Sequence, residues 1–338
     1  MSVFFDACRG VPTPYTPIWL NRQAGRYMPE YHRVKGTTPS LEFFKNPELA
    51  AKVTLDAQRI LNVDAAIMFA DLLPMLEPMG FELHYEAGVG PVFANPIKTI
   101  DDVERVRVIP ATEGVGYISQ TVQNILQDLP KTIALIGFAG APFTLASYVL
   151  EGKGSRDFQQ TKTFMYSHPD AWRKLLDKLT QAIGDYVELQ IEAGVQAVQI
   201  FDSWVGTLAR TDYETYVAPH TKTLMQRLAG HVPIIYFAVG NSHLLESMQA
   251  TGPDFLALDW RVDLKASWDH LGTPAIQGNL DPLVLCAEPE VIKSQARAIL
   301  DSVNGRAGHI FNLGHGIVPQ TPVDHVRCLV DFVHNYTG

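Results

Sequence analysis

The chain has 338 residues, of which 46% are hydrophobic and 19% are charged, and its formal net charge is −9 at pH 7. This balance is typical of a globular protein and unlike that of a disordered one. An acidic surface is poorly attracted to nucleic acid or to an anionic membrane, so both are disfavoured as general partners, whereas locally clustered positive charge can still bind an anionic substrate.

The three cysteines, Cys8, Cys286 and Cys328, stand far apart in the sequence. That spacing fits neither a disulfide framework nor a zinc knuckle, and we expect a cytoplasmic protein. No stretch reaches the roughly 20 apolar residues that span a bilayer, and the first residues lack the features of a signal peptide. We therefore expect neither membrane attachment nor export.

Short apolar runs rich in β-branched residues predict eight strands. These are residues 18–20, 65–69, 133–136, 197–201, 234–237, 255–258, 275–277 and 310–313. Between most of them apolar residues recur at steps of three and four, as in 170–192, which predicts amphipathic helices. The segment 83–96, with Gly88, Gly90 and Pro91 at its centre, predicts an added hairpin.

Alternating strands and helices predict an α/β protein with a parallel sheet, and eight repeats favour a closed (β/α)8 barrel of the TIM type. An open α/β sheet is the alternative, because one wrongly predicted strand would change the number of strands from the eight that a closed barrel needs. No G-x-G-x-x-G sequence follows an early strand, which disfavours a dinucleotide-binding fold. Because no linker divides the chain, we expect residues 1–338 to form a single domain.

The first predicted strand runs into a loop that carries two arginines. Arg22 and Arg26 flank the small residues Ala24 and Gly25. Gly25 and the following Pro29 disfavour a helix here. Each guanidinium stays charged and can hold a carboxylate through two parallel hydrogen bonds, while the small residues let a ligand approach the backbone. The loop therefore predicts a carboxylate-binding site.

Polar or glycine residues follow every predicted strand where it ends. They are Asn21 and Arg22, Asp71, Gly137 to Gly140, Asp202 and Ser203, Gly240 and Asn241, Asp259, Gly278 with Asn279 and Asp281, and Gly314 with His315. In a parallel barrel these positions line one mouth, where barrel active sites are built. For any single residue, strand termination or helix capping is the better interpretation.

Three of these regions have specific alternatives. Asp71 would either cap the next helix or pair with an arginine, or else accept hydrogen bonds from a ligand. The glycine-spaced turn before Tyr148 lacks the Lys-Ser or Lys-Thr of a phosphate-binding loop, so we interpret its glycines as residues of a tight turn. Tyr148 by itself is most simply a core residue. His315 lies between two glycines, which favours an exposed imidazole, and no second ligand stands near it for zinc.

Taken together, these segments resemble the uroporphyrinogen decarboxylase family from about Phe4 to the C-terminus. Six motifs occur in the family's order, namely R-Q-A-G-R with P-E-Y from Arg22, G-F-A-G-A-P-F-T-L-A-S-Y-V-L-E-G from Gly137, F-D-S-W from Phe201, L-D-W from Leu258, Q-G-N-L-D-P from Gln277 and N-L-G-H-G from Asn312. The resemblance implies a (β/α)8 barrel, a homodimer, and a carboxy-lyase that needs no metal or organic cofactor. Its substrate would be uroporphyrinogen III, which loses its four acetate carboxyls stepwise to give coproporphyrinogen III.

The resemblance also assigns site residues. Those that match its substrate-binding positions are Arg22, Gln23, Ala24, Gly25, Arg26, Asp71, Tyr148, Ser203 and His315. The two arginines would bind carboxylates and Asp71 would accept the pyrrole N–H groups. Tyr148, Ser203 and His315 would hydrogen-bond the substrate near its reacting side chains.

Asp71, Arg22 and His315 are the candidates for catalysis. Protonating a pyrrole carbon makes the ring an electron sink for decarboxylation, and a fixed carboxylate such as Asp71 would stabilise the positive charge that develops. As proton donor, His315 has the better-matched ordinary pKa, near 6.5, whereas that of an arginine exceeds about 12. Arg22 in a dry pocket and a relayed water stay open as alternatives.

Four positions depart from what the resemblance leads us to expect. Asn21 replaces a usual methionine, Ala70 and Ala139 replace usual serines, and Val239 replaces a usual lysine, whose loss could weaken a peripheral carboxylate contact. Two other functions are weighed. A methyltransferase of the related barrel family would need clustered His and Cys ligands for zinc, and a tetrapyrrole carrier would use the same anion site without turnover.

Overall fold

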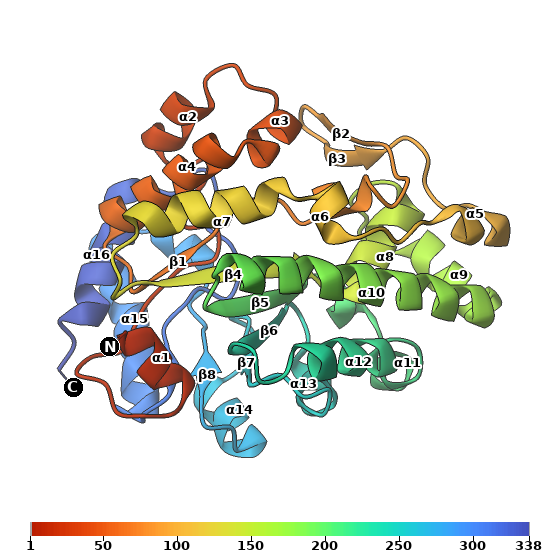
Figure 1. Ribbon diagram of the computed structural model, residues 1–338. Helices are drawn as coiled ribbons and strands as arrows, with labels where there is room; N and C mark the ends of the chain where they lie inside the picture. Colours follow the sequence, from red (N-terminus) through yellow and green to blue (C-terminus); the bar gives the residue numbers. More distant parts are fainter. Residues whose placement is uncertain (1, 338) are drawn as a thin grey trace.

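A computed structural model describes residues 2–337, so the two ends of the predicted 1–338 domain lie outside the described residues. Seven parallel strands form one curled sheet inside a layer of helices (Figure 1). In sheet order they are β1 (Ala65–Ile67), β4 (Ala134–Gly140), β5 (Ala197–Asp202), β6 (Ile234–Ala238), β7 (Phe255–Ala257), β8 (Ile276–Gln277) and β9 (His309–Ile310). These are seven of the eight predicted strands, because short buried apolar runs form the strands of a parallel sheet.

The predicted strand 18–20 is reduced to one bridge, in which Ile18 pairs in parallel with Phe311. The Phe311 N–H donates to the Pro17 carbonyl at 2.8 Å, and the Asp64 N–H donates to the Ile18 carbonyl at 2.9 Å. This segment therefore joins the chain beside β9 to the chain beside β1 and closes the ring. It is short because Pro17 cannot donate to a ladder and the chain turns directly after Leu20. The predicted (β/α)8 barrel is confirmed.

The outer helices pack as a second ring. In packing order they are α4 (Pro47–Leu61), α7 (Tyr117–Asp128), α10 (Pro169–Ala193), α12 (Ala218–Leu228), α11 (Arg210–Tyr216), α13 (Leu245–Gln249), α14 (Leu264–Leu271), α15 (Pro289–Val303) and α16 (Val323–His334), which returns to α4. The predicted helix at 170–192 is confirmed as α10. Apolar faces of the helices and the strands share one contiguous core that reaches from Phe4 to Val333.

Shorter helices fill the connections. They are α1 (Val3–Cys8), α2 (Pro29–Lys35), α3 (Ser40–Lys45), α5 (Ile100–Arg105), α6 (Ala111–Gly114), α8 (Pro142–Glu151), α9 (Gln159–Ser167) and the 3-10 turns η1 (Pro74–Leu76), η2 (Val205–Thr207), η3 (Ser242–Leu244) and η4 (Pro282–Cys286). Within residues 2–337, no helix has the length and apolar character needed to span a bilayer.

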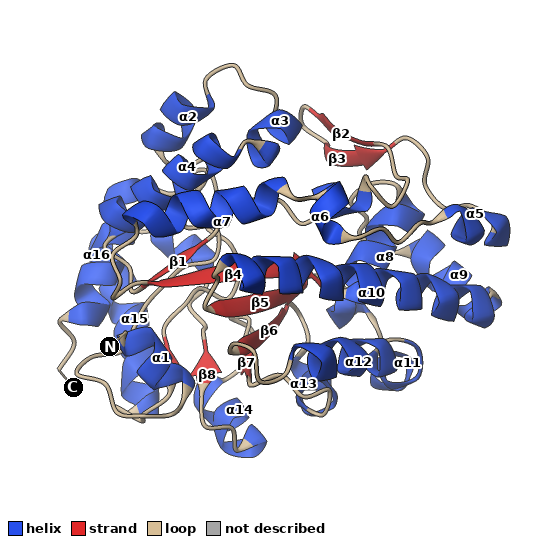
Figure 2. Cartoon of the chain, viewed as in Figure 1, coloured by secondary structure: helices blue, strands red, loops and turns tan. Residues whose placement is uncertain are grey.

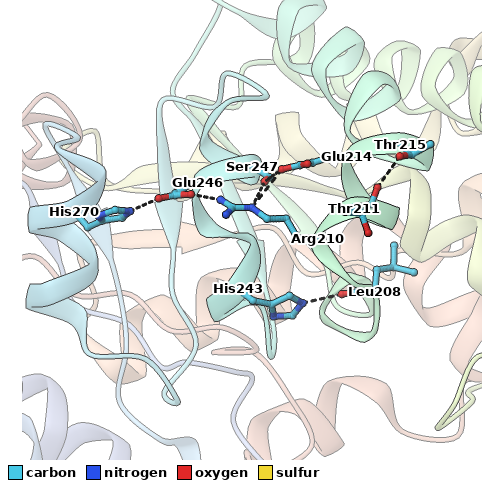
Figure 3. A network of polar contacts seen from close by, with 9 residues as sticks. All are labelled: Leu208, Arg210, Thr211, Glu214, Thr215, His243, Glu246, Ser247 and His270. Atoms are coloured by element: carbon cyan, nitrogen blue, oxygen red, sulfur yellow. Dashed lines mark hydrogen bonds and ion pairs between the residues drawn. The ribbon is translucent and has the colours of Figure 1, made fainter.

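A surface network ties three of the outer helices together (Figure 3). Arg210 of α11 donates to Glu246 of α13, and Glu246 also bonds the imidazole of His270 on α14. Next to them the Ser247 hydroxyl donates to Glu214 at 2.6 Å. Apart from the buried Ser247, the side chains of this network are exposed, so its ion pairs add little to stability but fix how the helices meet.

The predicted hairpin at 83–96 is also confirmed. It consists of β2 (Leu83–Glu86) and β3 (Gly90–Phe93), which pair antiparallel around a turn that contains Gly88 at φ +77°. The hairpin lies beside α3 in Figure 2 and contacts it. A bridge from Val92 to Lys153 and a 2.8 Å bond from the Phe93 N–H to the Gly152 carbonyl hold it to the end of α8.

Candidate active site

The carboxyl ends of the strands surround a cavity of about 420 Å³. Of the predicted site residues, those that line it are Arg22, Ala24, Gly25, Arg26, Asp71, Tyr148, Ser203 and His315. They come from the loop after the first predicted strand, from the ends of β1 and β5, from α8 and from the loop after β9. Residues far apart in the sequence are thus brought to one mouth, as the barrel geometry requires.

Gln23 is the exception among the predicted site residues, because it does not line the cavity. It is fully buried, its Oε1 accepts from the Leu20 N–H at 3.1 Å, and its Nε2 donates to the Ala65 carbonyl at 3.2 Å. Both ends of the amide are therefore occupied by backbone. Gln23 shapes the arginine loop and packs it onto β1, and we do not expect it to touch a ligand.

Arg22 has a backbone conformation that the sequence did not predict. Its φ is +60°, in the left-handed region that costs a non-glycine residue about 1–3 kcal/mol. This turn sends the side chain into the cavity, where it lies against Gly316, and a Cβ at Gly316 would collide with the Arg22 stem. The surrounding protein displaces water from the guanidinium, which disfavours its charged form and lowers the pKa of Arg22. The charge of Arg26 lowers this pKa further.

Asp71 lies in the cavity wall four residues after the end of β1 and is half-buried. Its Oδ1 accepts from the Leu73 N–H at 3.0 Å, which is a local turn bond. Asp71 does not cap the following 3-10 turn, whose N-cap is Leu73 and which has no side-chain cap bond. Burial raises the pKa of Asp71, and the Leu73 N–H, the neighbouring Tyr85 and the charge of Arg22 offset part of this effect. Within residues 2–337 Asp71 makes no ion pair, which leaves its charge to be balanced by a ligand.

His315 is half-buried, although its glycine flanks suggested an exposed imidazole. Gly314 and Gly316 instead allow close packing, because a Cβ at Gly314 would collide with the Trp260 backbone. The Trp260 ring meets the imidazole edge-on at 6.4 Å between ring centroids. Burial and the charge of Arg22 lower the pKa of His315 to about 4. A pKa of about 4 keeps the imidazole neutral near pH 7, which weakens the argument for His315 as proton donor from its ordinary pKa.

We expect His315 to titrate near pH 4 and its pKa to rise toward the ordinary value in an Arg22→Gln variant. Removing the guanidinium charge removes one cause of the depression, while burial, the larger cause, stays. Histidine proton NMR over pH 3–8 measures this, and a His315→Asn variant identifies the resonance. A His315 pKa near 6.5 in the unmodified protein would contradict the prediction.

The buried carboxylate of Asp202 supports the elements that carry Tyr148 and Ser203. The Asp202 carboxylate accepts from the hydroxyls of Thr144 in α8 and Tyr236 in β6, both at 2.8 Å. It thereby joins the end of β5, which precedes Ser203, to the helix that carries Tyr148. Burial raises the pKa of Asp202 to about 6, and burial with the charge of Asp71 raises that of Tyr148 to about 12.

An aromatic floor was not anticipated from the sequence. Phe138, Phe201 and Phe237 end neighbouring strands and meet edge to face, with ring centroids 5.8 Å and 5.6 Å apart. Tyr85 of the hairpin also lines the cavity. Phe201 and Phe237 are the last residues of two predicted strands, whereas Phe138 lies two residues beyond the predicted strand 133–136, so the predicted bounds did not bring the three rings together.

Of the remaining departures, Ala139 and Val239 lie away from the cavity. Val239 does not line it, so the structure gives no support to a weakened carboxylate contact there, whereas Ala70 does line it. The cavity wall contains one histidine, one aspartate and no cysteine. Across residues 2–337 no group of three or more His, Cys, Asp or Glu side chains is placed to hold a metal ion.

Comparisons with known proteins place this arrangement in a family. The model of the family described as uroporphyrinogen decarboxylase (URO-D) matches residues 1–336. A protein of that name from Chloroflexus aurantiacus is 50% identical over 98% of this chain and 95% of its own length. One from Carboxydothermus hydrogenoformans is 49% identical over 100% and 97%, respectively.

Among solved structures, a methyltransferase from Methanosarcina mazei superposes with a TM-score of 0.80 over 98% of this chain and 96% of its own. Its sequence identity is 18%, so the likeness shows the shared barrel fold alone. The family match and the relatives near 50% identity show the family as well as the fold, because both cover nearly the whole sequence. This chain belongs to the uroporphyrinogen decarboxylase family.

Proposed function

We propose that this chain is a uroporphyrinogen decarboxylase, a carboxy-lyase that removes the four acetate carboxyls of uroporphyrinogen III stepwise to give coproporphyrinogen III. The observation that carries the proposal is the charge pattern of one cavity. Two arginines, Arg22 and Arg26, share it with Asp71, a carboxylate that makes no ion pair within residues 2–337 although the charge of Arg22 acts on it. The substrate has the complementary pattern, with carboxylates at its rim and pyrrole N–H donors at its centre.

Each part of the cavity has a role in this proposal. Arg22 and Arg26 hold rim carboxylates through paired hydrogen bonds. Asp71 accepts the pyrrole N–H groups, and Tyr148, Ser203 and His315 hydrogen-bond the side chains around it. The aromatic floor packs against the apolar face of the macrocycle. Together these contacts orient one acetate for reaction before any bond changes.

The reaction begins when a proton adds to a pyrrole carbon next to the acetate. The bond between the acetate methylene and its carboxylate then breaks, its electron pair neutralises the protonated ring, and CO2 leaves. A second proton then adds to the exocyclic methylene to give a methyl group, and the proton first added to the ring carbon leaves, which restores the neutral pyrrole. Positive charge develops on the ring in this sequence, and the fixed Asp71 carboxylate stabilises it. Bound N–H donors favour the ionised form of Asp71, against the burial that raises its pKa.

The structure changes the balance between the proton donors considered above. His315 is neutral near pH 7 and acts as a hydrogen-bonding group. Arg22, whose pKa is lowered by its surroundings, is a better acid than a free arginine and lies in the same cavity as Asp71. We therefore favour Arg22, directly or through a water molecule that it orients, as the source of the first proton.

Anaerobic incubation with uroporphyrinogen III, followed by chromatography, tests the proposed function. We expect products with seven, six, five and finally four carboxyls to appear in turn. Substrate returned unchanged by folded protein would indicate a tetrapyrrole carrier. Zinc at one equivalent per chain in protein purified without chelator would instead favour the methyltransferase alternative.

Three further expectations accompany this proposal. A single domain over residues 1–338 is supported by the contiguous core. A homodimer follows from the family resemblance, and light scattering on purified protein measures it. The cytoplasmic location rests on the scattered cysteines and stays a prediction.

A further inference from the structure

A line of hydrogen bonds crosses the inside of the barrel and ends at the cavity. The Trp19 indole N–H donates to Gln277 Oε1 at 2.9 Å, and Gln277 Nε2 donates to Gln199 Oε1 at 2.9 Å. Gln199 Nε2 donates to Asn21 Oδ1 at 2.9 Å, and Asn21 Nδ2 donates to the Leu313 carbonyl at 3.2 Å. We call Trp19, Gln277, Gln199 and Asn21 the amide chain.

The amide chain is unusual for a barrel interior, which branched apolar side chains normally fill. Trp19, Gln199 and Gln277 are fully buried and Asn21 is 2% exposed. Gln199 in β5 and Gln277 in β8 lie on strands that are not neighbours in the sheet, so the chain spans the ring rather than following its wall. All of its donors point the same way along the line, and each bond therefore polarises the next.

Asn21 is the member at the cavity, and all its polar groups are engaged. Besides its two side-chain bonds, its N–H donates to Asn312 Oδ1 and its carbonyl accepts from the Ile317 N–H, both at 3.0 Å. Asn21 thus holds the loop of residues 312–317 at both ends. This loop carries His315 and Gly316, and Arg22 follows Asn21 directly in the chain.

We propose that Asn21 is a positioning residue that fixes the Arg22 turn and the His315 loop to each other and anchors both to the barrel through the amide chain. The inference rests on the proposed function for its effect on catalysis. Arg22 is held at a positive φ, which persists only where surrounding bonds over-determine the backbone. A methionine at position 21 would leave the Gln199 amide N–H and the Leu313 carbonyl without these partners.

Asn21→Leu is the principal variant, because leucine keeps the size of asparagine and removes both side-chain bonds. We expect amide hydrogen exchange in residues 312–317 to become at least tenfold faster, while exchange in β5 and β6 stays unchanged. We also expect kcat to fall at least tenfold with little change in KM. If Asn21 acts through Arg22, its effect on kcat will be much smaller in an Arg22→Lys background, since coupled residues are not additive.

Gln58→Met is the matched control. Gln58 is a buried amide whose Nε2 donates to the Val63 carbonyl at 3.2 Å, and it does not line the cavity. We expect it to lower thermal stability without accelerating exchange in residues 312–317 or lowering kcat. If Asn21→Leu does not fold, Gln199→Met carries the same test, because it removes the donor to Asn21 Oδ1.

Unchanged exchange in residues 312–317, or exchange that rises equally throughout the barrel, would overturn the positioning role. The positioning role would also be overturned if the double variant lost kcat by the product of the two single-variant losses, because Asn21→Leu and Arg22→Lys would then act independently. Localised exchange in a protein whose unmodified form does not decarboxylate uroporphyrinogen would support the structural role of Asn21 and refute the proposed function. The exchange measurement therefore tests the positioning role of Asn21, and the product assay separately tests the proposed function.

Discussion

Asp71→Asn is expected to lower kcat for uroporphyrinogen decarboxylation by about 10²–10³-fold, the usual cost of removing one preorganised electrostatic contact to a developing charge. Asparagine keeps the oxygen that accepts from the Leu73 N–H at 3.0 Å, so the turn after β1 should persist. What it removes is the negative charge that we propose faces the pyrrole nitrogens. Product chromatography under saturating substrate measures the loss.

The same substitution should leave thermal stability at pH 7 unchanged or raise it. Burial raises the folded-state pKa of Asp71, so the folded protein binds this proton more tightly than the unfolded chain does. The contribution of Asp71 to stability is therefore fully present below the ordinary carboxyl pKa and is lost as the pH rises through the folded-state value. Above that range the charge costs stability, and a neutral amide avoids the cost.

Asp64→Asn provides the opposite signature and serves as the control. Asp64 is buried away from the cavity, where it accepts from the Tyr15 hydroxyl at 2.9 Å and from the Ile18 N–H at 2.8 Å. We expect this variant to melt at a lower temperature while kcat is retained. An Asp71→Asn enzyme with near-normal turnover, or one whose loss of activity follows from unfolding, would sink the role assigned to Asp71.

The sequence pattern was sufficient for those parts of the structure that depend on local periodicity. Seven predicted strands, the helix at 170–192 and the hairpin at 83–96 follow from the spacing of apolar residues and glycines. The convergence of Arg22, Asp71 and His315 follows from the rule that parallel strands present their carboxyl ends at one mouth. Segment 18–20 became a single bridge because Pro17 and the turn at Arg22 limit it.

Features that depend on long-range contacts were beyond the sequence pattern. The bond from Gln199 to Asn21 joins residues 178 positions apart, and that from Trp19 to Gln277 joins residues 258 apart. No periodicity connects such pairs, so the sequence marks Asn21 as a polar residue at a strand end and as a departure from the expected methionine, but does not predict its bonds. The pKa of His315 likewise depends on burial and on the charge of Arg22, which comes from the other end of the chain.

Arg22→Lys is expected to lower kcat/KM by about 10²-fold, mainly through kcat, even though the charge is conserved. Lysine is a point charge on a flexible stem and cannot hold a carboxylate through two parallel bonds, and a small loss of orientation is sufficient for an effect of this size. Both residues would suffer the same cost at φ +60°, so the backbone contribution cancels in the comparison. Steady-state kinetics with uroporphyrinogen III separates the two parameters.

Both arginines are exposed in the open cavity, but the Arg22 stem packs against Gly316, so Arg26→Lys should behave differently. We expect a modest rise in KM that grows with ionic strength and little change in kcat, as for a contact made equally in the ground state and the transition state.

Gly316→Ala supplies an independent route to Arg22, since the added methyl would displace the Arg22 stem while the guanidinium stays present. It should reproduce part of the kcat loss of Arg22→Lys, whereas Gly154→Ala, which meets no atom within 4 Å, should not. Equal losses in the two arginine variants would mean that the cavity recognises only positive charge, and that the geometry imposed by the Arg22 turn is irrelevant to turnover.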